Sequence, residues 1–202
     1  MDLLKVNKFN ISLAAAKLRT RSTVVYPTET AYGLGADPFC LVAVKKIYQI
    51  KGRNFKKPLP LIADSYKTVE KYFFLTALEK NLAKRYWPGP LTILLKSKKQ
   101  LTKLKDFLKV ERIAVRVSSS KTACQLARGC KGLVTATSAN ISGAGECYSI
   151  VALKKQFDSS LYKPDLILDD GRLKKIRPST MVIVEGRKIS ILRQGSLQLN
   201  NI

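Results

Sequence analysis

Three short stretches hold most of the side chains that could do chemistry, and each lies beside an apolar run. They are "YPTETAYGLG" (26–35), "KGRNFKK" (51–57) and "TSANISG" (137–143). Together they offer hydroxyl, amide, carboxylate, ammonium and guanidinium groups, with glycines that permit tight turns. In open α/β sheets, ligands bind in the crevice outside the strand ends. Polar strand ends of this composition suit an anionic ligand that also carries hydroxyl groups.

The residue types that are missing narrow the chemistry further. The chain has no histidine, which excludes Ser-His-Asp and Cys-His nucleophiles and zinc sites that mix His with Cys. Its four cysteines form no CxxC pair, and we expect them to be reduced. Any reaction therefore relies on Lys, Arg, Ser, Thr, Asn, carboxylates, backbone dipoles or a borrowed metal ion.

Each polar stretch also has a simpler explanation. Ser, Thr and Asn bond local backbone, so "TSANISG" alone is more typical of a plain loop. Lys51 and Arg53 close a predicted helix, where cations stabilise the macrodipole by about 0.3–1 kcal/mol. Two further lysines, Lys56 and Lys57, follow at once, and this density favours a polyphosphate clamp instead. Neither "GLG" nor "SGAG" has the spacing of a Walker A loop or a dinucleotide fingerprint.

The chain is strongly basic, with 37 Lys and Arg, 14 Asp and Glu, and a formal net charge of +23. Such a field attracts polyanions. Much of the excess is lysine, so a general compositional bias explains an individual surface lysine equally well. No apolar run approaches the ~18 residues of a membrane-spanning helix, and the N-terminus lacks signal-peptide features, so we expect a cytoplasmic protein.

The elements that position these residues alternate between helix and strand. This pattern indicates one α/β domain over residues 1–202, with a twisted mixed sheet and flanking helices. The predicted strands are 22–28, 59–64, 90–97, 112–118, 132–139, 165–171, 179–186 and 188–195, with the last two joined as a hairpin. The predicted helices are 10–20, 41–52, two stretches between residues 65 and 87, 119–129 and 149–157. Candidate start signals are Asn10 or Ser12 for the first helix, a capping box at Thr76 and Glu79, and Ser149 for the last.

Seven motifs in this order resemble the YrdC/TsaC family of threonylcarbamoyl-AMP synthases. They are "YPTETAYGLG", "KGR" with "KKPLPLI", "WPGPLT", "AVRV", "TSANISG", "PSTMV" and "LRQG". The resemblance spans residues from about 12 to 196 and is to the short bacterial form, which lacks an extra C-terminal domain. It implies a YrdC-like fold, in which a twisted α/β sheet surrounds a deep basic cavity.

The resemblance also implies a reaction. Family members combine L-threonine, bicarbonate or carbon dioxide, and ATP into threonylcarbamoyl-adenylate and diphosphate. This nucleotidyltransferase step begins the threonylcarbamoyladenosine modification of tRNA beside the anticodon, and a partner complex then transfers the group to tRNA. A magnesium ion is expected to come with ATP, without a dedicated protein site. The attacking group is the carbamate of the substrate itself, so a chain without histidine is no obstacle.

The resemblance assigns roles residue by residue. The implied catalytic quartet is Lys51, Arg53, Ser138 and Asn140. The implied threonine contacts are Thr30, Arg116, Ser138 and Ser179. The implied ATP contacts are Arg53, Lys57, Arg112, Asn140, Ser149 and Arg193. Tyr32 either shapes the pocket or belongs to the core.

The chain departs from the family at two places. Many relatives carry a histidine near the threonine, where this chain has Ile62 and Ala63, so a contact there is expected to be apolar or made by the main chain. No proline follows Arg116, although one is common in the family. The role of Glu29 stays open between a magnesium ligand, an arginine partner and the turn itself.

Two other functions remain to be weighed. The basic charge is also typical of a protein of this fold that binds double-stranded RNA or tRNA or assists ribosome maturation. The intact quartet favours the enzyme, because a pure RNA binder does not need it. A related carbamoyl-adenylate enzyme of hydrogenase maturation is disfavoured, because such proteins carry additional domains.

Overall fold

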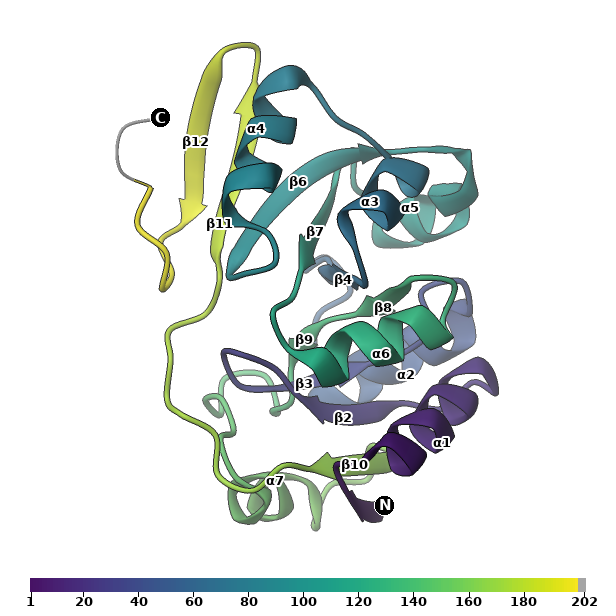
Figure 1. Cartoon of the computed structure of the whole chain (residues 1–202). Helices are drawn as coiled ribbons and strands as arrows, with labels where there is room; N and C mark the ends of the chain where they lie inside the picture. Colours follow the sequence, from purple (N-terminus) through teal and green to yellow (C-terminus); the bar gives the residue numbers. More distant parts are fainter. Residues whose placement is uncertain (200–202) are drawn as a thin grey trace.

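The computed structural model describes residues 1–199 and arranges them around two mixed β-sheets (Figure 1). The first sheet has the strand order β1 (Asp2–Lys5), β10 (Leu166–Asp169), β2 (Val24–Pro27), β3 (Tyr32–Gly35) and β9 (Thr137–Ser138). The second has the order β12 (Lys188–Arg193), β11 (Thr180–Glu185), β6 (Leu91–Ser97), β7 (Ile113–Val117), β4 (Leu61–Ala63) and β8 (Leu133–Thr135), with β5 (Phe73–Phe74) paired to β6. Both sheets contain parallel and antiparallel neighbours. The predicted mixed α/β class is confirmed, with two sheets in place of one.

A single predicted strand explains the division into two sheets. The run 132–139 forms β8 in the second sheet and then β9 in the first, and Ala136 lies between them. The Ala136 N–H donates to the carbonyl of Pro60 at 2.8 Å, and the Thr135 N–H donates to the carbonyl of Ala36 at 3.0 Å. The crossing segment is therefore bonded to both sheets, and the polar end of the strand lies between them.

Helices cover both faces of the first sheet. α1 (Lys8–Arg19) and α6 (Lys121–Gly129) lie side by side on one face, and α2 (Leu41–Lys51) lies on the other (Figure 1). Side chains alternate along a strand, so Val24 and Tyr26 pack in the cluster under α1 and α6, whereas Val25 packs in the cluster that holds α2. The remaining helices are α3 (Tyr66–Tyr72), α4 (Ala77–Tyr86), the 3-10 turn η1 (Lys99–Leu101), α5 (Thr102–Leu108) and α7 (Ile150–Phe157).

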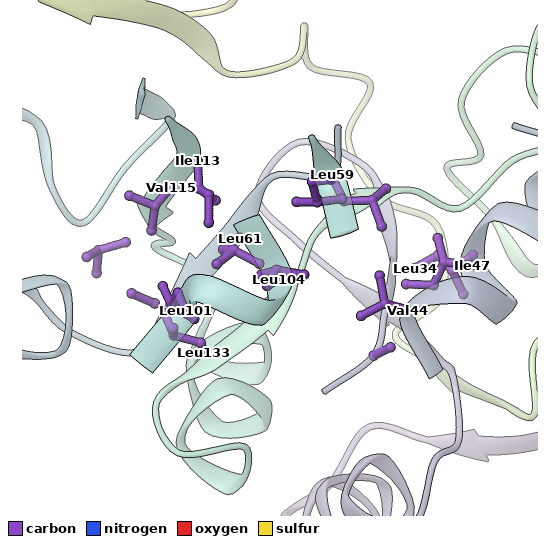
Figure 2. Close-up of a cluster of buried hydrophobic side chains, with 14 of the residues drawn as sticks. Leu34, Val44, Ile47, Leu59, Leu61, Leu101, Leu104, Ile113, Val115 and Leu133 are labelled. Atoms are coloured by element: carbon purple, nitrogen blue, oxygen red, sulfur yellow. The ribbon is translucent and has the colours of Figure 1, made fainter. Parts of the chain in front are cut away.

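One apolar core connects the two sheets. Figure 2 shows Leu34, Val44 and Ile47, from the first sheet and α2, in the same cluster as Leu61 and Val115 of the second sheet. All five side chains are fully buried. Burial of apolar area at about 25 cal/mol per Å² favours this arrangement, and it holds the sheets together around the space between them.

Local signals set most helix ends. The capping box at Thr76 and Glu79 starts α4, and Ser149 caps α7, both as predicted. Gly52 ends α2 in the left-handed region, with φ +56°. The start of α1 differs from the prediction, because the side chain of Asn7 accepts from the Asn10 N–H at 2.8 Å. None of the helices within residues 1–199 is long and apolar enough to cross a membrane.

Candidate functional site

A cavity of about 200 Å³ opens where the two sheets meet. The β2–β3 turn and β9 line one side of it, and β6, β7, β11 and β12 line the other. The lining residues are Thr28, Thr30, Ala31, Tyr32, Gly33, Arg53, Pro58, Pro60, Thr92, Arg116, Ala136, Thr137, Ser138, Glu146, Pro178, Ser179, Met181 and Arg193. Most are hydroxyl-bearing, cationic or small, which suits a polar anionic ligand.

Thr28 organises the turn that carries "YPTETAYGLG" into the cavity. Its hydroxyl donates to the Ala31 carbonyl at 2.7 Å and accepts from the backbone N–H of Thr30 at 3.2 Å. It also lies 3.1 Å from the hydroxyl of Thr30. The side chain thus fixes the hydroxyl of Thr30 at the cavity wall. Behind the turn, a Cβ at Gly35 would lie 2.8 Å from the Thr135 carbonyl oxygen. Glycine therefore allows β3 to approach β8 this closely.

Arg116 on β7 brings a buried guanidinium to the cavity. Its Nη1 pairs with the carboxylate of Glu29, and the other oxygen of that carboxylate accepts from the Ser118 hydroxyl. Burial lowers the pKa of Arg116 to about 10. The side chain therefore stays cationic at neutral pH, and it suits a ligand carboxylate.

Ser179 and Arg193 form one polar wall on the side of the second sheet. The Ser179 hydroxyl lies 2.8 Å from the hydroxyl of Thr92 on β6. The guanidinium of Arg193 donates through Nε and Nη2 to the Ser179 carbonyl, at 3.1 and 2.9 Å. These bonds place two hydroxyls and one cation side by side, where a ligand with both charge and hydrogen-bonding groups can bind.

Arg53 reaches the cavity from the end of α2. The left-handed Gly52 turns the chain there, and Arg53 then donates through Nε to the Lys57 carbonyl at 3.2 Å and through Nη2 to the Pro58 carbonyl at 3.1 Å. Burial lowers the pKa of Arg53. Two carbonyl bonds hold the guanidinium in place beside the cavity, as expected for a residue that orients phosphate groups.

Lys51 supports the "TSANISG" turn from beneath the cavity. The side chain is 1% exposed, and its ammonium donates to the carbonyls of Ser138 at 2.5 Å and Asn140 at 2.7 Å. The Asn140 side-chain oxygen accepts from Lys51 at 3.1 Å and from the Ser138 hydroxyl at 2.5 Å. Burial and the nearby Arg53 lower the pKa of Lys51 to about 7. Lys51 and Asn140 therefore set the position of Ser138, which lines the cavity.

Glu146 is the one carboxylate among the lining residues that the structure describes. It accepts from the Tyr148 hydroxyl at 2.6 Å. Burial and the neighbouring carboxylate raise the pKa of Tyr148 to about 12, so that hydroxyl stays a donor. Against three guanidiniums, this single carboxylate leaves the cavity net positive.

Comparison with known proteins decides the family. The sequence model of the Sua5/YciO/YrdC family, whose description is "Telomere recombination", matches residues 16–195. The chain belongs to this family. It is similar to the threonylcarbamoyl-AMP synthase of Psychromonas ingrahamii, with 37% identity over 163 residues, 78% of this chain and 83% of that protein. It is also similar to the threonylcarbamoyl-AMP synthase of Vibrio vulnificus strain YJ016, with 32% identity over 189 residues, 92% of this chain and 98% of that protein.

Solved structures of the family share the fold. The crystal structure of P. abyssi Sua5 complexed with L-threonine matches with a TM-score of 0.84 and 31% identity. The match covers 96% of this chain and 56% of that one, so this chain spans little more than half of that Sua5 protein. The YrdC-like fold expected from the motifs is therefore confirmed.

The structure brings most of the predicted site residues to one place. The predicted residues that line the cavity are Thr30, Arg53, Arg116, Ser138, Ser179 and Arg193. Lys51 and Asn140 lie directly behind this wall and touch Ser138. Tyr32 both lines the cavity and belongs to the core, and its hydroxyl donates to the Gly171 carbonyl at 2.8 Å.

Three predicted ATP contacts are not among the residues that line this cavity. The Lys57 side chain is exposed, and its carbonyl accepts from Arg53 and Tyr48. Arg112 donates to the Val184 carbonyl on β11 at 3.0 Å and pairs with Glu79 on α4. The Ser149 hydroxyl caps α7 by accepting from the Ala152 N–H.

The side chains of Ile62 and Ala63 do not reach the cavity. Both residues are fully buried in β4, and neither lines the cavity. Pro58 and Pro60, just before β4, are the apolar residues of this segment that line it.

Sequence reasoning missed several cavity residues. Thr28 and Thr92 lie inside the motifs "YPTET" and "WPGPLT" and both line the cavity. Their hydroxyl groups, within motifs already singled out, could have identified them as site residues. Glu146 lies outside every motif, in the loop between β9 and α7, and only the course of that loop brings it to the cavity. Within the part of the chain that the structure describes, no three His, Cys, Asp or Glu residues are grouped as a metal site.

Proposed function

We propose that this chain is a threonylcarbamoyl-AMP synthase. It joins L-threonine, bicarbonate or carbon dioxide, and ATP into threonylcarbamoyl-adenylate and diphosphate, the first step of threonylcarbamoyladenosine modification of tRNA next to the anticodon. The observation that carries the proposal is the convergence of three guanidiniums and several hydroxyls on one cavity. Its relatives in P. ingrahamii and V. vulnificus carry this name, and P. abyssi Sua5 was solved with L-threonine, which supports the same substrate here.

In this proposal the amino acid binds between the two sheets. Arg116 pairs with its carboxylate, and the hydroxyls of Thr30, Ser138 and Ser179 surround its polar groups. Pro60 and Ala136 give the side-chain methyl an apolar contact. The cavity is smaller than the 300–1,000 Å³ of pockets for drug-sized ligands, so the nucleotide extends beyond it.

The reaction needs no protein nucleophile. The threonine amine adds to carbon dioxide and loses a proton, which gives a carbamate. A carbamate oxygen then attacks the α-phosphorus of ATP, the bond to the bridging oxygen breaks, and diphosphate leaves with the electron pair. Holding two reactants in line contributes about 7–11 kcal/mol, and Arg53 and Arg193 stabilise the charge on the phosphates.

Lys51 and Asn140 act behind the cavity wall in this scheme. Lys51 donates to the Ser138 carbonyl, and the Asn140 side chain accepts from the Ser138 hydroxyl, so the two residues fix the position of Ser138. They are positioning residues, because neither lines the cavity. Protonated Lys51 adds a buried positive charge near the phosphates, where it favours nucleotide binding.

Magnesium is proposed to arrive with ATP and to neutralise phosphate charge. Mg²⁺ usually binds through one or two carboxylates together with substrate phosphates. Glu146 fits this role as a single protein ligand, because its carboxylate lines the cavity. Both oxygens of Glu29, in contrast, already have partners in the wall.

The setting of the reaction follows from its product. Threonylcarbamoyl-adenylate is an activated compound, so we propose that a tRNA threonylcarbamoyltransferase complex consumes it in the cytoplasm. The net charge of +23 supports weak attraction of tRNA or double-stranded RNA to the outer lysine-rich faces.

Diphosphate release from ATP tests the proposed function. We expect release that requires both L-threonine and bicarbonate and that falls sharply when L-serine replaces threonine. The same rate with serine, or with no amino acid, would show that the chain is a different enzyme.

A further inference from the structure

Glu29 lies in the β2–β3 turn, but the proposed reaction gives it no part. Its neighbours Thr28, Thr30 and Ala31 line the cavity, whereas Glu29 does not. Its side chain is 16% exposed and points into the wall between the two sheets, where it meets Arg116. Because Glu29 contacts Arg116 and does not line the cavity, we expect it to act on a protein group and not on a ligand.

The contacts of Glu29 join three elements. Its carboxylate pairs with Arg116 on β7 and accepts from the Ser118 hydroxyl at the end of β7. Ser118 also accepts from the Ser120 N–H at 3.1 Å, and the Ser120 hydroxyl donates to the Pro27 carbonyl at 3.0 Å. Because Ser120 caps α6, a closed chain of bonds connects the turn of the first sheet, the end of β7 and the start of α6.

Only one edge of Arg116 takes part in this chain of bonds. The pair with Glu29 is made through Nη1, and the same side chain lines the cavity. A guanidinium has five N–H donors on a rigid plane, so it can hold one carboxylate on one edge and offer another edge to a second. The Arg116 side chain is buried, and that of Glu29 is 16% exposed, so most of the pair is shielded from solvent.

We propose that Glu29 is a positioning residue for Arg116. It holds the guanidinium so that the remaining donors face a ligand carboxylate, and this sets the preference of the site for a free carboxylate. The proposal deepens the function above and rests on it, because the carboxylate is that of the amino acid substrate.

The structure argues against the two other roles of Glu29. A magnesium ligand needs a carboxylate that faces the phosphates, and both oxygens of Glu29 are bonded inside the wall. The turn does not depend on Glu29 either, because the Thr28 hydroxyl bonds Thr30 and Ala31 across it.

Binding of L-threonine and of L-threoninamide, which lacks the free carboxylate, tests the proposal. We expect Glu29→Ala to weaken threonine binding at least ~10-fold while threoninamide and ATP binding change less than ~2-fold. Glu29→Gln keeps an acceptor for Arg116 and an amide donor for Ser118, so its loss is smaller and in the same direction. If Glu29→Ala does not fold, binding is measured with Glu29→Gln instead, because glutamine has nearly the same size as glutamate and leaves no empty space in the wall.

A double-mutant cycle shows whether Glu29 acts through Arg116. If it does, Glu29→Ala added to Arg116→Ala changes threonine binding less than ~2-fold beyond Arg116→Ala alone. Glu185→Ala, which removes an exposed carboxylate at the end of β11, is the matched control and is expected to bind all three ligands as the wild type does.

The role of Glu29 and the proposed function can fail separately in these measurements. Wild-type binding of threonine with unchanged binding in both Glu29 variants overturns this inference and leaves the proposed function standing. Additive losses in the cycle, or an equal loss of ATP binding, also overturn it, because both indicate general damage. Failure of the wild type to prefer threonine over threoninamide overturns the proposed function and this inference with it.

Discussion

Arg53 and Lys57 lie four positions apart, yet only Arg53 presents its charge to the cavity. We expect Arg53→Ala to lower kcat/KM for ATP at least ~10-fold, because a positioned cation beside the phosphates is lost. Lys57→Ala is the matched control, since the carbonyl that Arg53 and Tyr48 use is retained. Steady-state kinetics with folded variants measure both. Equal losses in the two variants would show that bulk charge, and not position, matters at this end of α2.

Lys51 gives a second prediction at this scale. Its pKa is lowered to about 7, so at pH 8 part of the empty enzyme carries a neutral amine there. Bound phosphates favour the ammonium and raise that pKa again, and ATP binding should therefore take up a proton. Calorimetry at pH 8 in two buffers of different ionisation enthalpy measures this uptake. We expect it in the wild type and not in Lys51→Met; identical uptake in both would assign the proton to another group.

The site residues were predictable where a motif fixed their type and spacing. Thr30, Arg116 and Ser179 were found in this way, and all three line the cavity. The carbonyl that Arg112 bonds was not predictable, because a guanidinium suits a phosphate and a backbone carbonyl equally well, and only the fold shows the bond to Val184. Glu146 was not predictable either, because only the path of its loop brings it to the cavity.

Arg112 acts at the scale of elements. It bonds the carbonyl of Val184 on β11 and contacts Glu79 on α4, so it ties a sheet to a helix. We expect Arg112→Ala to lower the free energy of unfolding by about 1–3 kcal/mol, because it leaves buried acceptors without a partner. The KM for ATP should change less than ~2-fold. Denaturant unfolding measures the free energy of unfolding, and steady-state kinetics measures the KM for ATP. A raised KM with unchanged stability would show that Arg112 contacts the nucleotide.

Element patterns predicted most strands and helices but not the sheet to which each belongs. The run 132–139 has the composition of one strand, and its division at Ala136 depends on partners at least 70 residues away, in β4 and β3. β1 (Asp2–Lys5) was missed because it has only two apolar residues, and α5 (Thr102–Leu108) because lysines interrupt its apolar pattern. Long-range pairing, and not local propensity, decides these cases.

The charge of the whole molecule leads to a prediction about salt. A net charge of +23 attracts tRNA through phosphate contacts that release counterions. We expect tRNA affinity to fall at least ~100-fold between about 50 and 200 mM salt, whereas diphosphate release changes far less, since Arg116 in the cavity is buried and salt screens buried charges less. Filter binding measures the tRNA affinity, and the diphosphate assay measures the reaction rate at the same salt concentrations. A parallel fall in both would link RNA binding to catalysis.

Formation of threonylcarbamoyl-adenylate in this cavity can be tested directly by mass spectrometry of the reaction of the purified chain with ATP, L-threonine and carbon-13-labelled bicarbonate. We expect an adenylate that contains threonine and carries the label, and that disappears in the Arg116→Ala variant. Formation of AMP or ADP without a labelled threonine adduct would contradict this expectation.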